Sequence, residues 1–365
     1  MQKQKIGVIG WLYHGHMHTF YNNDFGTTVA ACDTNVEIVK RFQADHPEAG
    51  IFTDYREMAE KEALDAVIIS TPNWLHREMA VYFLERGINV FLEKPMGINR
   101  EEIDAILAAQ MKSGKICAVD FEMRVSREHR RIKEIISSGE IGEPCGFEFI
   151  HHRGAWLAEG RGVWRTKPEM SGGLAMMEGC HRIDAARSLL GEVTHVQSFS
   201  FPNVLPQYNH GNMRDNEIIH LWFEKNRRGM ILHSHTSSVF DAGIQDYAKL
   251  GHDYGYIITG SEGCIRVNIN EKSVLVCCYE DYHPDAKKGR RAAFKKLEDY
   301  SAMSEEKFDH DIVGNHMVFI KCCATGEPFH QSTLDAWKTH VVCLAADKSA
   351  DEGSSRIPVD YRMPV

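Results

Sequence analysis

The chain has 365 residues, of which 43% are hydrophobic and 25% are charged, a composition typical of a soluble globular protein with two domains. Its net charge of -9 argues against nucleic acid as a partner, because binding to phosphates needs a basic surface. No segment approaches the roughly 20 apolar residues that span a bilayer, and no signal peptide is evident. We therefore expect a cytoplasmic protein with no membrane partner, and we expect its ten cysteines to be reduced and mostly buried.

Up to about residue 120, short apolar runs alternate with amphipathic ones, a pattern that predicts a parallel sheet covered by helices. The expected strands are 6–10, 28–32, 51–52, 66–70, 89–92 and 116–119, and the clearest helices are 74–86 and 100–112. Because crossover connections are right-handed, the sheet should be doubly wound, with its ligand crevice beyond the carboxyl ends of the strands. These elements form a predicted α/β domain over residues 1–123.

After about Arg124 the strands become longer and alternate in polarity, which predicts an α+β domain over residues 124–365 with a large, open, mainly antiparallel sheet. The C-terminal segment of this domain could pack back on the first domain. The expected elements are strands 145–151, 195–201, 218–223, 229–235, 256–259, 264–269 and 357–359, and helices 180–190 and 333–350.

The first strand ends in a glycine-containing turn, Gly10 to Gly15, and Asp33 follows the second strand. In a Rossmann domain such glycines allow a tight turn and close helix packing, while the acid bonds a ribose hydroxyl of a dinucleotide. Leu12 departs from the usual pattern, because a glycine there lets the backbone approach the pyrophosphate. No arginine follows Asp33, which favours NAD over NADP, since a carboxylate repels a 2′-phosphate.

The next two strand ends carry the segments 70–76 and 93–97. Each could be ordinary turn chemistry, with Pro72 and Pro95 ending a strand and Asn73 capping a helix. Their shared position at the crevice favours a functional role. A lysine there, Lys94, would be desolvated, and a lowered pKa would suit it to polarise or deprotonate a hydroxyl group.

With these landmarks the sequence resembles the glucose-fructose oxidoreductase, inositol dehydrogenase and MocA (Gfo/Idh/MocA) family. The matching residues run through nearly the whole chain: the glycine turn with Asp33, Thr71-Pro72-Asn73 with His76, Glu93-Lys94-Pro95, Arg124, Ser137 to Gly142, Trp164-Arg165, Gly172-Gly173, Gly179 to Asp184, Asp215-Asn216, and Gly260 to Gly263. The resemblance implies a Rossmann domain that binds NAD or NADP, a second sheet that forms a homo-oligomer, and a carbohydrate or polyol as small-molecule substrate.

The resemblance also assigns residues to the site. It places Lys94 and His181 at the reacting centre, whereas the aspartate that many members carry four residues before this histidine is replaced by Met177, followed by Glu178. Catalytic roles are thus expected of Lys94, His181, Glu178 and Asp184. Cofactor contacts are expected of Gly10, Leu12, Tyr13, His14, Gly15, Asp33, Ser70, Thr71, Pro72, Asn73, His76, Glu93, Lys94 and Arg124. Substrate contacts are expected of Lys94 and His181. They are also expected of Arg153, Trp156, Trp164 and Arg165, because these residues lie in a Gly-rich stretch that could form a loop over the pocket, and aromatic rings with arginine donors suit a sugar or an aryl glycoside.

The expected reaction is oxidation of a hydroxyl group by hydride transfer to nicotinamide. His181 is the better candidate for the base because its ordinary pKa lies near neutrality, and Lys94 would stabilise the oxygen as it gains negative charge. Asp184 lies one helical turn from His181, where it could orient the imidazole or bind another hydroxyl group.

Other interpretations stay open. Histidine groups at 14, 16 and 18, at 151 and 152, and at 233 and 235 could bind a metal only if they converged in space, and we expect no metal site. The scaffold could instead serve an NAD-assisted glycosidase, which oxidises its substrate transiently, or a non-catalytic NAD-binding sensor. The sequence does not identify the sugar or the hydroxyl group.

Overall fold

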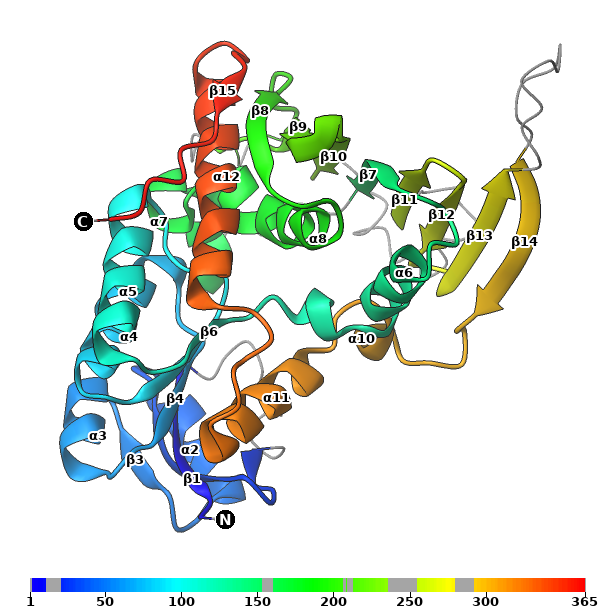
Figure 1. Cartoon of the computed structure of the whole chain (residues 1–365). Helices are drawn as coiled ribbons and strands as arrows, with labels where there is room; N and C mark the ends of the chain where they lie inside the picture. The colour runs from blue at the N-terminus through cyan, green and yellow to red at the C-terminus, as the bar shows by residue number, and fades with distance from the viewer. Residues whose placement is uncertain are drawn as a thin grey trace, which may run out of the picture.

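The computed structural model describes residues 2–10, 21–152, 160–205, 208, 213–235, 255–279 and 292–364. They form two sheets, each with helices packed on it, that lie one above the other in Figure 1. A continuous apolar core extends from the first sheet into the second. The two sheets confirm the predicted α/β and α+β organisation.

The first sheet is parallel, and its order β3-β2-β1-β4-β5-β6 is that of a Rossmann fold. Its strands are β1 (Gln4–Ile9), β2 (Gly26–Cys32), β3 (Gly50–Phe52), β4 (Ala66–Ile69), β5 (Asn89–Leu92) and β6 (Cys117–Val119). The central strand β4 is buried at every position, as expected for a strand covered by helices on both faces. The carboxyl ends of β1, β2, β4 and β5 therefore meet along one edge.

Helices from both ends of the chain cover this sheet. Its own crossover helices are α2 (Val36–Asp45), α3 (Tyr55–Lys61), α4 (His76–Glu85) and α5 (Arg100–Ser113). The later helix α11 (Ile312–Thr325) packs against β1, β2 and β5, with Phe319 and Ile320 in the same apolar cluster as Ile6 and Val8. A segment distant in sequence thus completes the packing of the first sheet.

The second sheet has nine strands among the described residues, in the order β14-β13-β12-β11-β7-β10-β9-β8-β15. Its strands are β7 (Pro144–His152), β8 (Val193–Phe199), β9 (Asn216–Phe223), β10 (Arg228–Ser234), β11 (Gly255–Gly260), β12 (Gly263–Asn268), β13 (Ser273–Tyr279), β14 (Ala292–Asp299) and β15 (Ile357–Pro358). The strands β7 and β10 pair in parallel, and the other neighbours pair antiparallel. The sheet is mixed, as predicted.

Two helices carry the second domain's side of the site. The helix α8 (Cys180–Leu190) follows a single π-helical turn, η4 (Ala175–Gly179), and packs on β7 and β10. The long helix α12 (Thr333–Asp351) contacts α8, β8 and the first domain's α5, and it lies between α5 and α8 in Figure 1. The indole of Trp337 on α12 donates a hydrogen bond to Asp104 on α5 at 2.7 Å. The two halves are thereby held by direct side-chain contacts.

The structure adds elements that the sequence pattern left unassigned, chiefly α6 (Arg127–Ser137), α11, β13 and β14. All ten cysteines are free, five of them buried and one exposed. Among the described residues no helix combines the length and the hydropathy that a membrane crossing requires.

Candidate functional site

A cavity of about 1230 Å³ lies at the carboxyl ends of the first sheet's strands. It exceeds the roughly 300–1,000 Å³ of pockets for drug-sized ligands, so it has room for a dinucleotide and a second small molecule. Most of its wall comes from the first domain, and the second domain contributes Trp164, Arg165 and Met177. Of the sequence-predicted site residues, the cavity is lined by Gly10, Asp33, Ser70, Thr71, Pro72, Asn73, Glu93, Lys94, Trp164 and Arg165.

Gly10 and Asp33 take the positions expected of a dinucleotide site. Gly10 has φ +74°, and a Cβ atom there would lie 2.4 Å from the carbonyl oxygen of Ser70, so only glycine fits this turn. Asp33 follows β2, and its carboxylate accepts a hydrogen bond from the backbone N–H of Asn35 at 2.7 Å. The expected cofactor residues Leu12, Tyr13, His14 and Gly15 lie outside the described residues.

His76 and Asn73 connect the loops around the cavity. The buried imidazole of His76 has its two ring nitrogens 2.7 Å from the carbonyl oxygen of Pro95 and 2.9 Å from that of Thr71. Asn73 donates a hydrogen bond across to the carbonyl oxygen of Ser171 at 2.9 Å. These two residues therefore fix the geometry of the strand ends, and His76 does so from behind the cavity wall.

Lys94 faces the second domain. Its Nζ atom donates a hydrogen bond to the backbone carbonyl oxygen of Met177 at 3.1 Å. Met177 lies in the π-helical turn η4, and its side chain is on the cavity wall, whereas Glu178 is 7% exposed and is not among the lining residues described. Single π-helical turns are frequent at functional sites, and this one brings position 177, rather than the acid at 178, to the cavity.

His181 lies one turn beyond Met177, at the start of α8, with 7% of its surface exposed. Its Nδ1 atom has no hydrogen-bond partner within the described part of the chain and is 3.6 Å from Oε2 of Glu122. Burial, and secondarily the positive charge of Lys94, hold the pKa of His181 well below its usual value. The imidazole is therefore neutral at physiological pH and able to accept a proton.

The carboxyl group that faces His181 is Glu122 and not the expected Asp184. The carboxylate of Asp184 is buried and accepts two hydrogen bonds from Arg124, at 2.6 and 2.7 Å, as well as bonds from Gln331 and Thr339. Arg124, expected to contact the cofactor, is held by Asp184 and also pairs with Asp335 at 2.6 Å. Asp184 and Arg124 thus join α8 to α12 in an ion-pair network.

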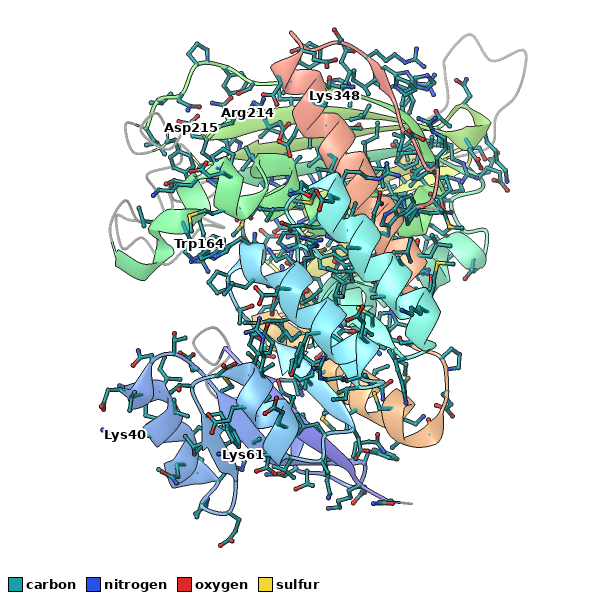
Figure 2. All side chains as sticks on the ribbon, turned by 90° about the vertical axis from the view of Figure 1, so that its left-hand side faces the viewer. Lys40, Lys61, Trp164, Arg214, Asp215 and Lys348 are labelled. Carbon is teal, nitrogen blue, oxygen red and sulfur yellow. The ribbon has the colours of Figure 1, made fainter. Side chains whose placement is uncertain are left out.

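Aromatic residues from the two domains meet at the cavity mouth. Trp74 and Trp164 pack edge to face with their ring centroids 5.4 Å apart, and the guanidinium of Arg165 lies 4.6 Å from the ring centroid of Trp164. Figure 2 shows Trp164 on the side of the second domain that faces the first. Two other expected substrate residues, Arg153 and Trp156, lie outside the described residues.

The histidine groups considered as metal ligands are placed only in part. His14, His16 and His18 lie outside the described residues. His151 and His233 lie on the neighbouring strands β7 and β10 with their ring centroids 5.5 Å apart, and His235 has its Nδ1 atom 2.5 Å from the hydroxyl of Tyr208. These contacts are ring packing and hydrogen bonding within the second domain.

Sequence reasoning missed a buried polar group behind the cavity, formed by Glu122, Asp120 and His316. Asp120 accepts a hydrogen bond from Asn315 at 2.7 Å, and His316 has its Nδ1 atom 2.7 Å from the hydroxyl of Tyr21. The signal available in the sequence was a pair of acids flanking Phe121, directly after a buried strand. The partners of Asp120, Asn315 and His316, come from α11, a helix far away in the chain.

Comparison with known proteins decides the family. A family model described as an oxidoreductase family with an NAD-binding Rossmann fold matches residues 4–121, and the C-terminal-domain model of the same Gfo/Idh/MocA family matches residues 129–266. The chain belongs to this family. It is an oxidoreductase with NAD as cofactor, in agreement with the size of the cavity, the turn at Gly10 and the carboxylate of Asp33.

Relatives of this Gfo/Idh/MocA protein extend over most of the chain. Scyllo-inositol 2-dehydrogenase (NAD(+)) of Bacillus subtilis is 26% identical over 302 residues, which cover 82% of this chain and 79% of that protein. Myo-inositol 2-dehydrogenase of Thermotoga maritima is 25% identical over 360 residues, with 96% and 97% covered. The structure of levoglucosan dehydrogenase with NADH and levoglucosan, at 21% identity, has a TM-score of 0.80 and covers 99% of this chain and 100% of that chain.

Proposed function

We propose that the protein oxidises a secondary hydroxyl group of a sugar, cyclitol or glycoside. When bound, NAD supplies the hydride acceptor. Lys94 binds the hydroxyl oxygen and stabilises it as it gains negative charge, while His181 removes the proton. The observation that carries this proposal is that Lys94 lies on the cavity wall and that burial, together with the positive charge of this lysine, lowers the pKa of His181.

The supporting evidence for the substrate class is chemical as well as comparative. Two relatives are named for inositols and one solved structure contains levoglucosan, all of them compounds with several hydroxyl groups on a ring. Trp164 offers an apolar face to such a ring, and Arg165 offers hydrogen-bond donors to its hydroxyl groups. Glu178 is buried beside this wall, and we propose no direct contact between it and the substrate.

We further propose a preference for NAD over NADP. Asp33, Asp54 and Glu78 place three carboxylates around the cavity wall beside β2, and a 2′-phosphate would be repelled there. Arg56 also lines this part of the cavity, and its guanidinium forms ion pairs with Glu78 and Asp54. Steady-state kinetics with NAD and with NADP test this preference.

We also propose that the protein is a homo-oligomer assembled through the open face of the second sheet. The paired strands place one row of half-buried or exposed side chains on this face: His220, Met230, Glu148, Ile257, Arg266 and Leu275. Apolar side chains arranged in this way indicate a protein interface. Glu148 and Arg266 could pair across a two-fold axis. Light scattering of a Met230→Glu variant should give a smaller particle than the unaltered protein.

The deciding experiment is a screen of purified protein with NAD or NADP. The compounds are scyllo-inositol, myo-inositol, levoglucosan, common hexoses and aryl glycosides, and both NADH absorbance and aglycone release are followed. Formation of NADH in proportion to the substrate consumed supports the proposal. Aglycone release without net NADH, or no reaction with any compound, would contradict it.

A further inference from the structure

Glu122 faces a different histidine with each of its two carboxyl oxygens. Its Oε2 atom is 3.6 Å from Nδ1 of His181, and its Oε1 atom is 3.6 Å from Nε2 of His310. As a whole residue, Glu122 is 4% exposed. It lies in η2 (Glu122–Val125), directly after the last strand of the first sheet, while the histidines come from α8 and from the segment after α10 (Glu305–Phe308). The fold brings these three residues together from distant parts of the chain.

His310 is held in the tautomer that can receive a proton from Glu122. Its Nδ1 atom lies 2.6 Å from Oδ2 of Asp309, so Nδ1 carries the hydrogen and donates it, which leaves Nε2 as an acceptor towards Glu122. Asp309 is buried, and although burial alone raises its pKa, His310 and Arg182 hold that pKa below its usual value. Asp309 is therefore a carboxylate that orients the ring.

His310 is also the point where this group reaches water. Its side chain is 32% exposed, compared with 9% for His181 and 6% for Glu122. In the proposed function, the buried His181 takes a proton from a hydroxyl group of the bound substrate. That proton must reach solvent before the next turnover, and the exposed fractions place the exit at His310.

We propose that His181, Glu122 and His310 form a proton relay that carries the hydroxyl proton from the site to solvent. This inference rests on the proposed function. As the substrate O–H bond breaks, its hydrogen goes to Nε2 of His181, the ring nitrogen that does not face Glu122, and the hydride leaves carbon for nicotinamide with the electron pair. His181 passes its Nδ1 hydrogen to Oε2 of Glu122, and Glu122 passes the hydrogen on Oε1 to Nε2 of His310. His310 releases a proton to water.

Electrostatics keep the middle member of the relay neutral. Burial, reinforced by the negative charges of Asp120 and Glu93, raises the pKa of Glu122 well above its usual value, against a smaller opposite effect of Lys94. A protonated carboxyl group can donate from one oxygen while it accepts at the other, so no buried charge accumulates. The positive charges of Lys94 and Arg182 disfavour an imidazolium at His181 that stays in the site.

The two 3.6 Å separations are longer than hydrogen bonds. Catalytic hydrogen bonds are often long before ligands bind and shorten in the reacting complex. A movement of a few tenths of an ångström at each step would give hydrogen-bonding distance. Before the next turnover the His181 ring and the Glu122 carboxyl group each turn, so that a ring N–H again faces Glu122 and the hydrogen of Glu122 again faces His310.

The test uses the full protein with NAD and the most active compound of the screen, in weak buffer. A stopped-flow experiment follows NADH formation by absorbance and, in the same record, the release of protons to an indicator dye. His310→Gln and Glu122→Gln should each lower kcat by about a hundredfold, at the lower end of the range for loss of a proton-transfer group. Added imidazole should restore several-fold activity to His310→Gln, because a small base can reach the exposed end, and should not restore Glu122→Gln. His195→Gln, a histidine on β8, is the control.

The outcomes separate the relay from the proposed function. If the unaltered protein forms no NADH with any compound, the proposed function falls and the relay falls with it. If it forms NADH but His310→Gln keeps full kcat in weak buffer, or loses it without rescue by imidazole, the relay alone is overturned. A second measurement needs no substrate: nitrogen NMR of the histidine rings should show His310 with its hydrogen on Nδ1, and a hydrogen on Nε2 would exclude the step from Glu122.

Discussion

The ion-pair network around Asp184 gives the sharpest prediction, because sequence and structure assign Arg124 different tasks. The sequence placed Arg124 at the cofactor, whereas the structure binds it to Asp184 through two hydrogen bonds and to Asp335 through a third contact. We predict that Arg124→Met mainly lowers stability. NAD affinity of the folded protein should change by less than about threefold, equivalent to under 1 kcal/mol.

The size of the effect follows from burial. Asp184 is 1% exposed, and without Arg124 its carboxylate keeps only the neutral donors Gln331 and Thr339. Breaking a buried pair by removing one partner costs about 3–5 kcal/mol. With a denaturant dependence of roughly 1–3 kcal/mol per molar urea, the midpoint of unfolding should fall by about 1 M or more.

A double-mutant cycle provides the control. Asp184→Leu removes the charge that Arg124 neutralises, so the double variant should lose less stability than the sum of the two single losses, by about 1–3 kcal/mol for residues in direct contact. Urea unfolding gives the stabilities, and calorimetric titration with NAD gives the affinities. Unchanged stability together with lost NAD binding in Arg124→Met would refute this reasoning and return Arg124 to the cofactor site.

Three further predictions concern the reaction and its pH dependence. Lys94→Ala should lower kcat by about 10²–10³-fold with NAD binding retained. Because the charge of Lys94 lowers the pKa of His181, the acidic limb of the plot of kcat/KM against pH should move to higher pH in this variant. An unshifted limb would show that Lys94 does not act on the pKa of His181. Asp33→Ser should raise the ratio of kcat/KM with NADP to kcat/KM with NAD by about tenfold or more, since 1.4 kcal/mol of relieved repulsion corresponds to tenfold. Steady-state kinetics with both cofactors measure this ratio. An unchanged ratio would mean that Asp33 does not face the ribose. Burial lowers the pKa of His340 to about 4, so between pH 6.5 and 4 the unfolded chain binds a proton at this residue and the folded protein does not. The free energy of unfolding should therefore fall as the pH is lowered from 6.5 to 4, by about 3 kcal/mol from this residue. In acid unfolding experiments, the His340→Gln variant should show a shallower fall.

The sequence by itself determined the architecture. The alternation of apolar runs with amphipathic helices predicted the strands of the first sheet within about two residues, because local hydrophobic periodicity reflects burial directly. It also determined the positions that depend on one strand end, such as Gly10, Asp33 and Lys94. The positions of these residues can be predicted from their own strand together with the rule that the carboxyl ends of parallel strands lie at one edge of the sheet.

Only the tertiary structure decided which side chains act on one another. Glu122 lies beside His181, and Asp184 accepts hydrogen bonds from Arg124, because α8 is packed between the end of the first sheet and α12. The π-helical turn directs Met177 to the cavity, and a helical wheel drawn from sequence has no such turn. His310 reaches Glu122 across almost 190 residues of chain. Contacts of this kind depend on how whole elements pack, and no local pattern records them.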